Sequence, residues 1–354
     1  MIRVLLINQN KIPHYRISIY SYLSSYLEHY GFELIIVSGG IQSGKSGVIE
    51  FRHKTITLST INLLRFISRE NIEIIIFWVN LKYLYLFPTL LISKIIFQKK
   101  IIYWGHGRDL IDIDSRLKNI AYNTQHVLSD AMILYAHHLK TYIPNFLHKK
   151  VFVANNTLCI NYEGLKLDQT KKNVLLKYGI HTNKNIICIG RIQKRKRIEN
   201  LVRAFTSMNR SDVGLILVGP DPDGILNKFE SNNLYKLGPI YGNDKFDLLS
   251  SADVYCLPGA LGLSIVDAFY CKLPIVTENG DMSPEIMYLK DGINGFIVPR
   301  NNVEQLAANL QLLLDNDVLR NRFSRAAKKE IMINGNIDMF CIGFRDALRF
   351  VWYK

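Results

Sequence analysis

A chain of 354 residues is longer than one hydrophobic core usually organises, so its length predicts two domains of ordinary size. Hydrophobic residues make up 48% of the chain and charged residues 21%, a balance that excludes disordered and fibrous proteins. The net charge of +14 favours an anionic partner, and composition leaves nucleic acid, phosphorylated metabolites and an anionic membrane surface open. Residues 1–160 carry 18 Lys and Arg against 9 Asp and Glu, an excess of 18 − 9 = 9.

The five cysteines are odd in number and scattered, and none forms a C-x-x-C pair. We therefore expect neither a disulfide framework nor a zinc site, and a reducing cytoplasm as the compartment. The first residues, MIRVLLINQN, fit a strand better than a signal peptide. Residues 72–97 are the most apolar stretch, but Glu73, Lys82, Pro88 and Lys94 interrupt it, so no membrane-spanning helix is predicted.

Short β-branched runs alternate with segments of helical period, which is typical of βαβ units and a parallel sheet. The first series of expected strands is Val4 to Asn8, Glu33 to Ser38, Glu73 to Val79, Lys100 to Trp104, Ala131 to Leu134 and Lys150 to Val153. The second is Asn185 to Ile189, Val213 to Val218, Leu234 to Leu237, Val254 to Leu257, Pro274 to Thr277 and Gly295 to Val298. The sequence therefore predicts two α/β domains, each a Rossmann-like, doubly wound parallel sheet.

A polar stretch at residues 155–172 separates the two series and is the best candidate for a linker. We expect an N-terminal domain at residues 1–160 and a C-terminal domain at 173–335. Within residues 336–354, Ile337 to Trp352 are expected to form a last amphipathic helix that packs back toward the first domain.

Gly39 to Ser46, GGIQSGKS, matches the P-loop pattern G-x-x-x-x-G-K-[ST]. A working P-loop opens a helix whose amides face the phosphates. The residues that follow begin with Gly47 and are rich in β-branched types, which argues against a helix. A loop of Gly and Ser is the favoured interpretation.

Two loops of the second series have the chemistry of a phosphate site. In GRIQKRKR, Arg191 and Lys196 lie between a strand and a helix and can converge on one anion, although a solvated basic loop is an equally good interpretation. In PGALGLSIVDAF, the amides of Ala260 to Leu263 form a helix start. Asp267 inside this apolar helix needs a partner, and ribose hydroxyls would serve; an exposed helix carboxylate is the alternative.

In the first series, WGHGRD follows an expected strand and places His106 at a carboxyl end of the sheet, where ligands collect. A capping or core histidine is the alternative. Asp221 and Asp223 in GPDPDG are the nearest imitation of a D-x-D metal pair, and we interpret them as turn residues, so no metal is expected.

The GRIQKRKR loop, the PGALGLSIVDAF block and SPEIMYLKDGINGFIV together resemble the donor-binding domain of the family 4 retaining glycosyltransferases, also called group 1. The likeness spans about residues 186–314, and NKIPHYR and YWGHG extend it loosely into the first half. It implies the GT-B fold, in which two such domains face a cleft. It also implies a nucleoside diphosphate sugar as donor, with no other cofactor.

On this resemblance Arg191 and Lys196 bind the donor diphosphate, and His106 reaches toward the donor sugar. Asp267 stands where the family has the second Glu of its E-x7-E signature, the residue that holds the ribose. The first Glu, which contacts the sugar, aligns with Gly259, so the chain departs from the main pattern there. Further donor contacts are expected from Gly190, the amides of Ala260, Leu261, Gly262 and Leu263, and main chain near Gly238 and Ile240. Glu285 matches a recurrent position of the family and is counted with these donor-binding residues, although a structural role is the favoured interpretation.

The implied reaction is glycosyl transfer with retention to a hydroxyl of a glycan or lipid-linked acceptor, as in lipopolysaccharide, O-antigen or capsule synthesis. The basic first half and the apolar LKYLYLF at residues 81–87 favour peripheral contact with an anionic membrane at the inner face of the plasma membrane. The rivals are a nucleotide-sugar epimerase of the same fold, a P-loop NTPase and a nucleic-acid-binding protein. No nucleic-acid reader motif is recognisable, so nucleic acid is not an expected partner.

Overall fold

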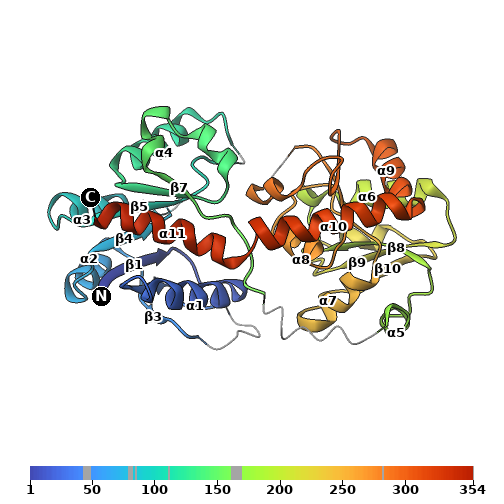
Figure 1. Ribbon diagram of the computed structural model, residues 1–354, viewed down its shortest axis with the longest axis horizontal. Coiled ribbons are helices and arrows are strands. Elements are labelled where there is room, and N and C mark those ends of the chain that lie inside the picture. Colours follow the sequence, from blue (N-terminus) through green and yellow to red (C-terminus); the bar gives the residue numbers. More distant parts are fainter. Residues whose placement is uncertain are drawn as a thin grey trace. The chain divides into compact units, whose positions relative to one another are not determined.

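The structure, a computed structural model, describes residues 1–42, 49–78, 83, 86–110, 112–160, 170–280 and 283–353. They form two compact α/β units (Figure 1). The first is coloured from blue to green and includes the red helix at the end of the chain, and the second is coloured from green to red. The first unit comprises Met1–Cys159 and Asn336–Lys354, and the second comprises Ile160–Gly335. The last helix of the chain therefore belongs to the first unit.

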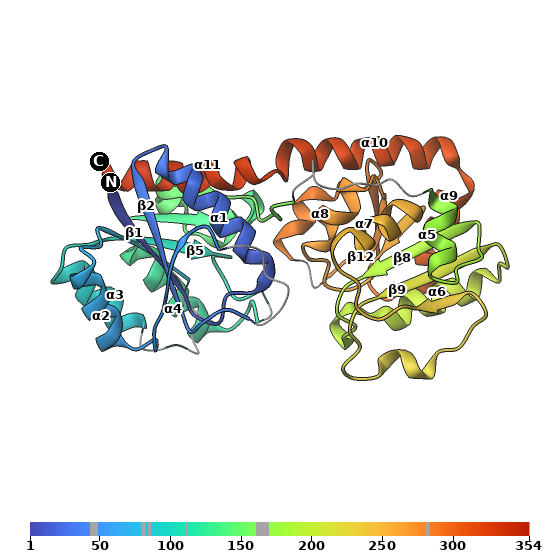
Figure 2. The same ribbon diagram turned by 90° about the horizontal axis from the view of Figure 1, so that it is seen from below.

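In the first unit the strands are parallel and lie in the order β3-β2-β1-β4-β5-β6-β7. Helices α1 and α11 contact each other on one face of this sheet, and α2, α3 and α4 lie on the other (Figure 2). The strands are β1 Ile2–Asn8, β2 Phe32–Ser38, β3 Arg52–Thr55, β4 Ile74–Phe77, β5 Lys100–Gly105, β6 Ala131–Leu134 and β7 Val151–Val153. The helices are α1 His14–Glu28, α2 Thr60–Arg69, α3 Leu86–Ile95, α4 Arg116–Leu128 and α11 Ile337–Trp352.

Strand β3 is one that the sequence pattern does not predict. It pairs in parallel with β2, with Arg52 opposite Ile35 and Thr55 opposite Ser38. Its residues Arg, His, Lys and Thr show no apolar alternation, because the strand lies at the edge of the sheet, where charged side chains discourage further pairing. The second half of the P-loop match, residues 43–46 with Lys45, lies outside the described part of the chain. From Arg52 onward the chain enters a strand and not a helix.

In the second unit the parallel order is β10-β9-β8-β11-β12-β13. Helices α6 and α9 pack together on one side, and α8 packs on α7 and α10 on the other. The strands are β8 Lys184–Ile189, β9 Val213–Val218, β10 Leu234–Lys236, β11 Val254–Cys256, β12 Ile275–Glu278 and β13 Gly295–Val298. The helices are α5 Lys171–Lys177, α6 Ile198–Met208, α7 Gly242–Ser251, α8 Ser264–Tyr270, α9 Val303–Asp315 and α10 Asp317–Asn334.

Both sheets are buried on both faces, which explains their continuous apolar strands. Leu5 and Ile75 at the centre of the first sheet and Ile187 and Leu215 in the second are at most 1% exposed. Helix α11 buries Phe340, Phe344, Leu348 and Val351, the period expected of an amphipathic helix, against β5, β6 and β7. Among the described residues, no helix is long and apolar enough to cross a membrane.

Candidate functional site

The strand order of the second unit creates a point where the chain leaves two neighbouring strands in opposite directions. Strands β8 and β11 are adjacent, with Val254 opposite Ile186, but β8 connects outward to β9 and β11 connects outward to β12. Such a switch point, where the chain continues to opposite sides of the sheet, is the usual ligand position in open α/β sheets. The first of these loops holds Arg191 and Lys196, and the second holds Gly259 to Leu263.

The two loops are hydrogen bonded to each other along their backbones. The amide of Gly259 donates to the carbonyl of Lys196 at 2.8 Å, and the amide of Ala260 donates to that of Arg195 at 3.2 Å. A Cβ at position 259 would lie 2.1 Å from the Arg195 carbonyl oxygen. This close approach explains the glycine: a Glu at the position of the family's sugar-contacting carboxylate does not fit here.

The same hydrogen bonds correct one expectation from the sequence. The amides of Gly259 and Ala260 are already engaged within the protein, so they are not the ones offered to a ligand in this conformation. The amides of Leu261, Gly262 and Leu263 make no hydrogen bond within the described residues. They precede α8 directly, so the amide contacts predicted for the loop fall to these three residues.

Lys196 is the better buried of the two expected cations. Its ammonium donates to the carbonyl of Ala260. Burial, assisted by the positive charge of Arg195, lowers the pKa of Lys196 to about 8, although the buried carboxylate of Glu285 opposes the change. Glu285 thus lies close enough to act on Lys196, from the 3-10 turn Pro284–Tyr288. An anion that binds beside Lys196 would therefore stabilise its charged form.

Arg191 is exposed just beyond the end of β8 and has no hydrogen bond or ion pair within the described residues. Gly190 before it has a φ of 147° and donates its amide to Val218 at 2.9 Å. The guanidinium of Arg191 thus extends from a backbone that is held in place, and it remains available to a ligand.

Arg197 fixes the loop and was not singled out by the sequence. Its side chain forms an ion pair with Glu278 at 2.9 Å and donates to the carbonyl of Pro258 at 2.9 Å. The Glu278 side chain is fully buried and also accepts from Asn200 and from the Asn301 amide. The sequence does not indicate this role for one cation among five, because the role depends on Glu278 at the end of β12.

Three glycines at neighbouring strand ends bring the backbone close together. The amide of Gly219, after β9, donates to Gly238, after β10, at 2.7 Å. A Cβ on Gly219 would lie 1.9 Å from the carbonyl of Gly190. Gly238 and the partly buried Ile240 therefore lie beside the basic loop, as nucleobase contacts at this edge would require. Asp221 accepts the amides of Ile225 and Leu226 at 2.9 and 2.8 Å, which makes it a turn residue.

Asp267 is buried in the first turn of α8, and it has a partner that the sequence did not reveal. Its Oδ2 accepts from the Lys245 ammonium at 2.8 Å, across from α7. Its Oδ1 is buried and has no hydrogen-bond partner within the described residues. Burial raises the pKa of Asp267, and the charge of Lys245 opposes that rise. One carboxylate oxygen is thus left to accept a hydrogen bond from a ligand.

His106 belongs to the first unit, one residue beyond β5. Its ring lies 4.8 Å from that of Tyr135 and 6.1 Å from that of Trp78. Burial and the positive charge of Arg16 lower the pKa of His106 to about 4, so the ring is neutral at pH 7. It is a hydrogen-bonding group there and not a cation.

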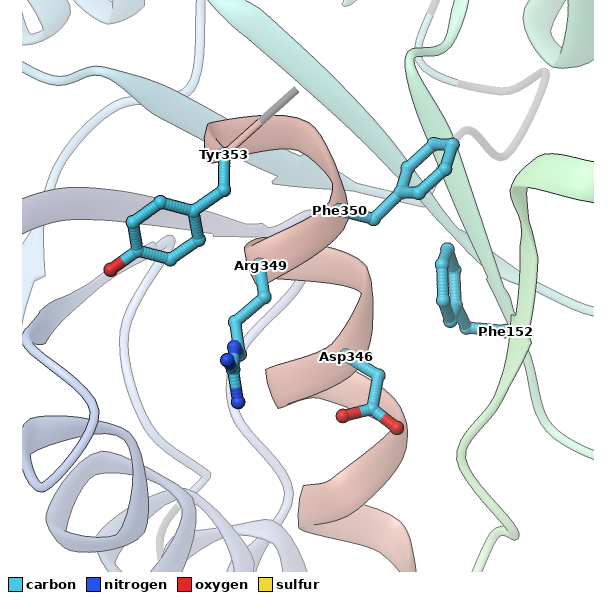
Figure 3. Close-up of a pocket in the computed structure, with 5 residues that line it drawn as sticks. All are labelled: Phe152, Asp346, Arg349, Phe350 and Tyr353. Atoms are coloured by element: carbon cyan, nitrogen blue, oxygen red, sulfur yellow. The ribbon is translucent and has the colours of Figure 1, made fainter.

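A separate pocket lies in the first unit between β7 and the end of α11, lined by Phe152, Asp346, Arg349, Phe350 and Tyr353 (Figure 3). The rings of Phe152 and Phe350 approach each other to 5.3 Å, and Asp346 pairs with Arg345. The pocket contains none of the predicted site residues. Within the described residues, no three side chains form a cluster suited to a metal ion.

Comparison with known proteins defines the class to which this geometry belongs. A glycosyltransferase from Rickettsia africae superposes with a TM-score of 0.77, at 16% identity over 99% of this chain and 98% of that one. Anabaena Alr3699/HepE in complex with UDP superposes with a TM-score of 0.75, at 14% identity over 98% and 99%. The fold is therefore GT-B, two parallel-sheet α/β domains, as expected from the sequence.

Residues 171–330, all within the second unit, match the family Glycosyl transferases group 1. An uncharacterized glycosyltransferase of Methanocaldococcus jannaschii is 24% identical over 68% of this chain and 65% of its own length. A phosphatidyl-myo-inositol mannosyltransferase of Mycobacterium leprae is 30% identical over 42% of each chain. The match thus spans less than two thirds of these relatives.

The lowered pKa of Lys196 predicts a pH dependence of anion binding. The ammonium attracts an anion and the neutral amine does not, so affinity for pyrophosphate should fall as pH rises through about 8. Titration calorimetry at pH 7.0 and 9.5 should show a loss of about tenfold or more in the wild type. In Lys196→Arg the loss should be much smaller, because arginine stays charged.

The comparison of the two proteins removes the contribution of pyrophosphate's own ionisation. Equal pH dependence in both would contradict the assignment. The pH dependence of stability has the opposite sign to that of anion binding. Because the unfolded chain binds more protons than the folded one between about pH 8 and the normal pKa of lysine, the free protein should gain stability as pH rises through that window.

Proposed function

We propose that this protein transfers a glycosyl unit from a nucleoside diphosphate sugar, first to be tested as a UDP-sugar, to a hydroxyl of a glycan or lipid-linked acceptor. The observation that carries the proposal is the pairing of the two loops after β8 and β11, which brings Arg191, Lys196 and the free amides of residues 261–263 to one sheet edge. The family of the second unit and the UDP complex of a protein with the same fold support it.

In the proposed reaction, the groups that contact the diphosphate contribute most to lowering the barrier. The bond from the anomeric carbon to the diphosphate oxygen breaks, the acceptor oxygen takes its place, and the acceptor proton is released. Negative charge accumulates on the leaving diphosphate, and fixed cations and amides that await it lower the barrier. Lys196 and Arg191 supply the charge in this proposal, without a metal ion. Retention of configuration is part of the proposal and rests on the resemblance to family 4.

Asp267 is proposed to hold the nucleotide ribose. Its unpartnered Oδ1 can accept one hydroxyl, while Lys245 holds Oδ2 and can itself donate to the neighbouring oxygen. The sugar cannot be recognised through a side chain at position 259, so recognition moves to the amides of Leu261 to Leu263. The contact of His106 with the sugar, implied by the resemblance, remains a prediction.

The acceptor is proposed to lie at a membrane, and one face of the first unit supports this. On α4, Leu117, Ile120 and Val127 repeat at helical spacing and are 82%, 63% and 57% exposed. On the neighbouring α3, Ile95 is 70% exposed, and Ile96 just beyond it is 67% exposed. Leu91, Gln125 and Leu128 line a common pocket, so the two helices are side by side. We call this exposed set the α3–α4 face.

Basic residues surround the α3–α4 face. Lys99, Lys100 and Arg116 lie on or beside its helices and have no ion pair within the described residues. Apolar side chains flanked by free cations suit the anionic inner face of a plasma membrane. An enzyme held there would meet lipid-linked intermediates of lipopolysaccharide, O-antigen or capsule synthesis.

Removing either cation from the diphosphate should reduce turnover. With UDP-sugar donors and a lipid-linked acceptor, Lys196→Ala and Arg191→Ala should each lower kcat by on the order of a hundredfold, the usual loss of an anion-stabilising donor. Lys194→Ala, an exposed cation of the same loop, should stay within about twofold of the wild type. Thermal unfolding should show that all three variants are folded.

Near-normal turnover in both Lys196→Ala and Arg191→Ala would overturn the proposed site. Product analysis separates the main rival, because an epimerase releases an altered nucleotide sugar without any acceptor. A panel of nucleoside diphosphate sugars in a thermal-shift assay should identify the donor, since a bound donor stabilises the folded state in proportion to its affinity.

The ribose role predicts a change in nucleotide discrimination. Asp267→Asn should weaken UDP binding by about tenfold, because a charged acceptor is lost. Binding of 2′-deoxy-UDP, which lacks one of the hydroxyls, should weaken less. Asp244→Asn, an exposed acid on α7, is the matched control and should alter neither affinity. Calorimetry that finds equal losses for the two nucleotides would contradict a contact of Asp267 with the 2′-hydroxyl.

Membrane contact predicts preferential binding to anionic vesicles. The double substitution Leu117→Ser, Ile120→Ser should reduce partitioning into phosphatidylglycerol vesicles by about tenfold or more, from the lost burial of two large aliphatic side chains. Val318→Ser, which alters an equally exposed residue of the second unit, should leave it unchanged. Equal sedimentation of the wild type with anionic and neutral vesicles would argue against this part of the proposal.

A further inference from the structure

Arg16 is a buried cation of the first unit that the donor site does not use. It lies in the first turn of α1, eight residues beyond the end of β1, and is only 8% exposed. In the first sheet, β1 and β4 are neighbours from which the chain departs in opposite directions, as β8 and β11 are in the second. Arg16 therefore follows the carboxyl end of a strand at the switch point of its own sheet, where ligands collect.

The guanidinium of Arg16 is surrounded by aromatic rings and lacks an anionic partner. Its Nη2 donates to the Oδ1 of Asn156 at 3.2 Å, and its Nη1 has no partner. Its central carbon lies 5.2 Å from the ring centre of Trp104 and 5.7 Å from those of Tyr135 and Tyr15. Within the described residues, no carboxylate forms an ion pair with it. A buried charge usually has such a partner.

The groups around Arg16 come from several strand ends and leave its charge uncompensated. Tyr135 follows β6, Asn156 follows β7, and His106 follows β5. His106 is neutral at pH 7, because burial and the charge of Arg16 lower its pKa to about 4. The rings of Tyr15, Trp104 and Tyr135 lie within cation–π distance of the guanidinium and carry no charge of their own. This arrangement accommodates a guanidinium and still leaves one of its nitrogens without an acceptor.

The start of α1 adds a second, independent source of positive potential. Pro13 caps the helix without a side-chain hydrogen bond, and the first turn contains no acidic residue. Helix amino ends that lack such groups favour anions. The buried guanidinium and the uncapped helix start are within one turn of each other, so they can act on the same ligand.

We propose that Arg16 and the start of α1 bind a phosphate group of the acceptor substrate, which makes the acceptor a phosphate-bearing molecule such as a lipid-linked diphosphate. This rests on the proposed function. Because Nη1 is shielded from solvent, the incoming phosphate displaces a neighbouring side chain. Tyr15, which is 38% exposed, is the ring of the surrounding set that lies at the surface. The phosphate then accepts from Nη1 in a charge-assisted hydrogen bond.

The test uses the full chain and farnesyl diphosphate, a lipid diphosphate without a sugar, in the presence of saturating UDP. The wild type should bind it, and Arg16→Met should weaken binding by about tenfold or more, the usual effect of losing a charge-assisted hydrogen bond. Arg16→Lys should retain part of the affinity. Lys11→Met, which removes an exposed cation of the same loop, should match the wild type. UDP binding should be unchanged in all variants, and thermal unfolding should show that they are folded.

Three results would overturn the inference: no binding by the wild type, binding by Arg16→Met equal to the wild type, or loss of UDP affinity in Arg16→Met. The last would mean that Arg16 contacts the phosphates of the nucleotide and not those of the acceptor. A wild type that binds farnesyl diphosphate through Arg16 but fails to bind any nucleotide would support this anion site while refuting the proposed donor. The two proposals can therefore fail separately.

Discussion

The backbone pairing between the loops after β8 and β11 is the constraint on which the candidate site depends. Two hydrogen bonds, from Gly259 to Lys196 and from Ala260 to Arg195, hold the loops so close that position 259 has no room for a Cβ. The same pairing brings the Lys196 ammonium to the Ala260 carbonyl. A side chain at position 259 and this loop geometry therefore exclude each other, so the Glu that the resemblance would place there does not fit.

The ion pair of Arg197 with Glu278 maintains this geometry. It ties the basic loop to the end of β12, and the additional bond to the Pro258 carbonyl ties it to the second loop. Breaking a buried pair of this kind generally destabilises a protein by about 3–5 kcal/mol, because one charge is left without compensation. With this ion pair in place, the loop keeps its conformation although its neighbouring cations repel one another. On the proposed function, binding by Lys196 and Arg191 and positioning by Arg197 are thus divided among residues that look alike in sequence.

Local patterns predicted the parts of the structure that local interactions determine. The strands Val213–Val218 and Gly295–Val298 and the helix Ile337–Trp352 have the bounds expected from their apolar periods. Strand β3 was not predicted, because an edge strand of Arg, His, Lys and Thr has no apolar period. In the site, loops rich in Gly and basic residues were recognisable. Lys245 was not, because it meets Asp267 only through the packing of α7 on α8.

The pair of Lys245 with Asp267 alters what the substitution of Asp for Glu means. A Glu can reach both hydroxyls of a ribose, whereas the shorter Asp has one oxygen bound to an ammonium and one left free. The Lys245 ammonium is also shielded on one side by an aromatic ring, because its nitrogen lies 4.4 Å from the ring centre of Phe246. On the proposed function, a diol would meet one acceptor and one donor here and not two acceptors. The ion pair of Asp267 with Lys245 would then bind the ribose, and the shorter side chain of Asp would place its carboxylate for that pair.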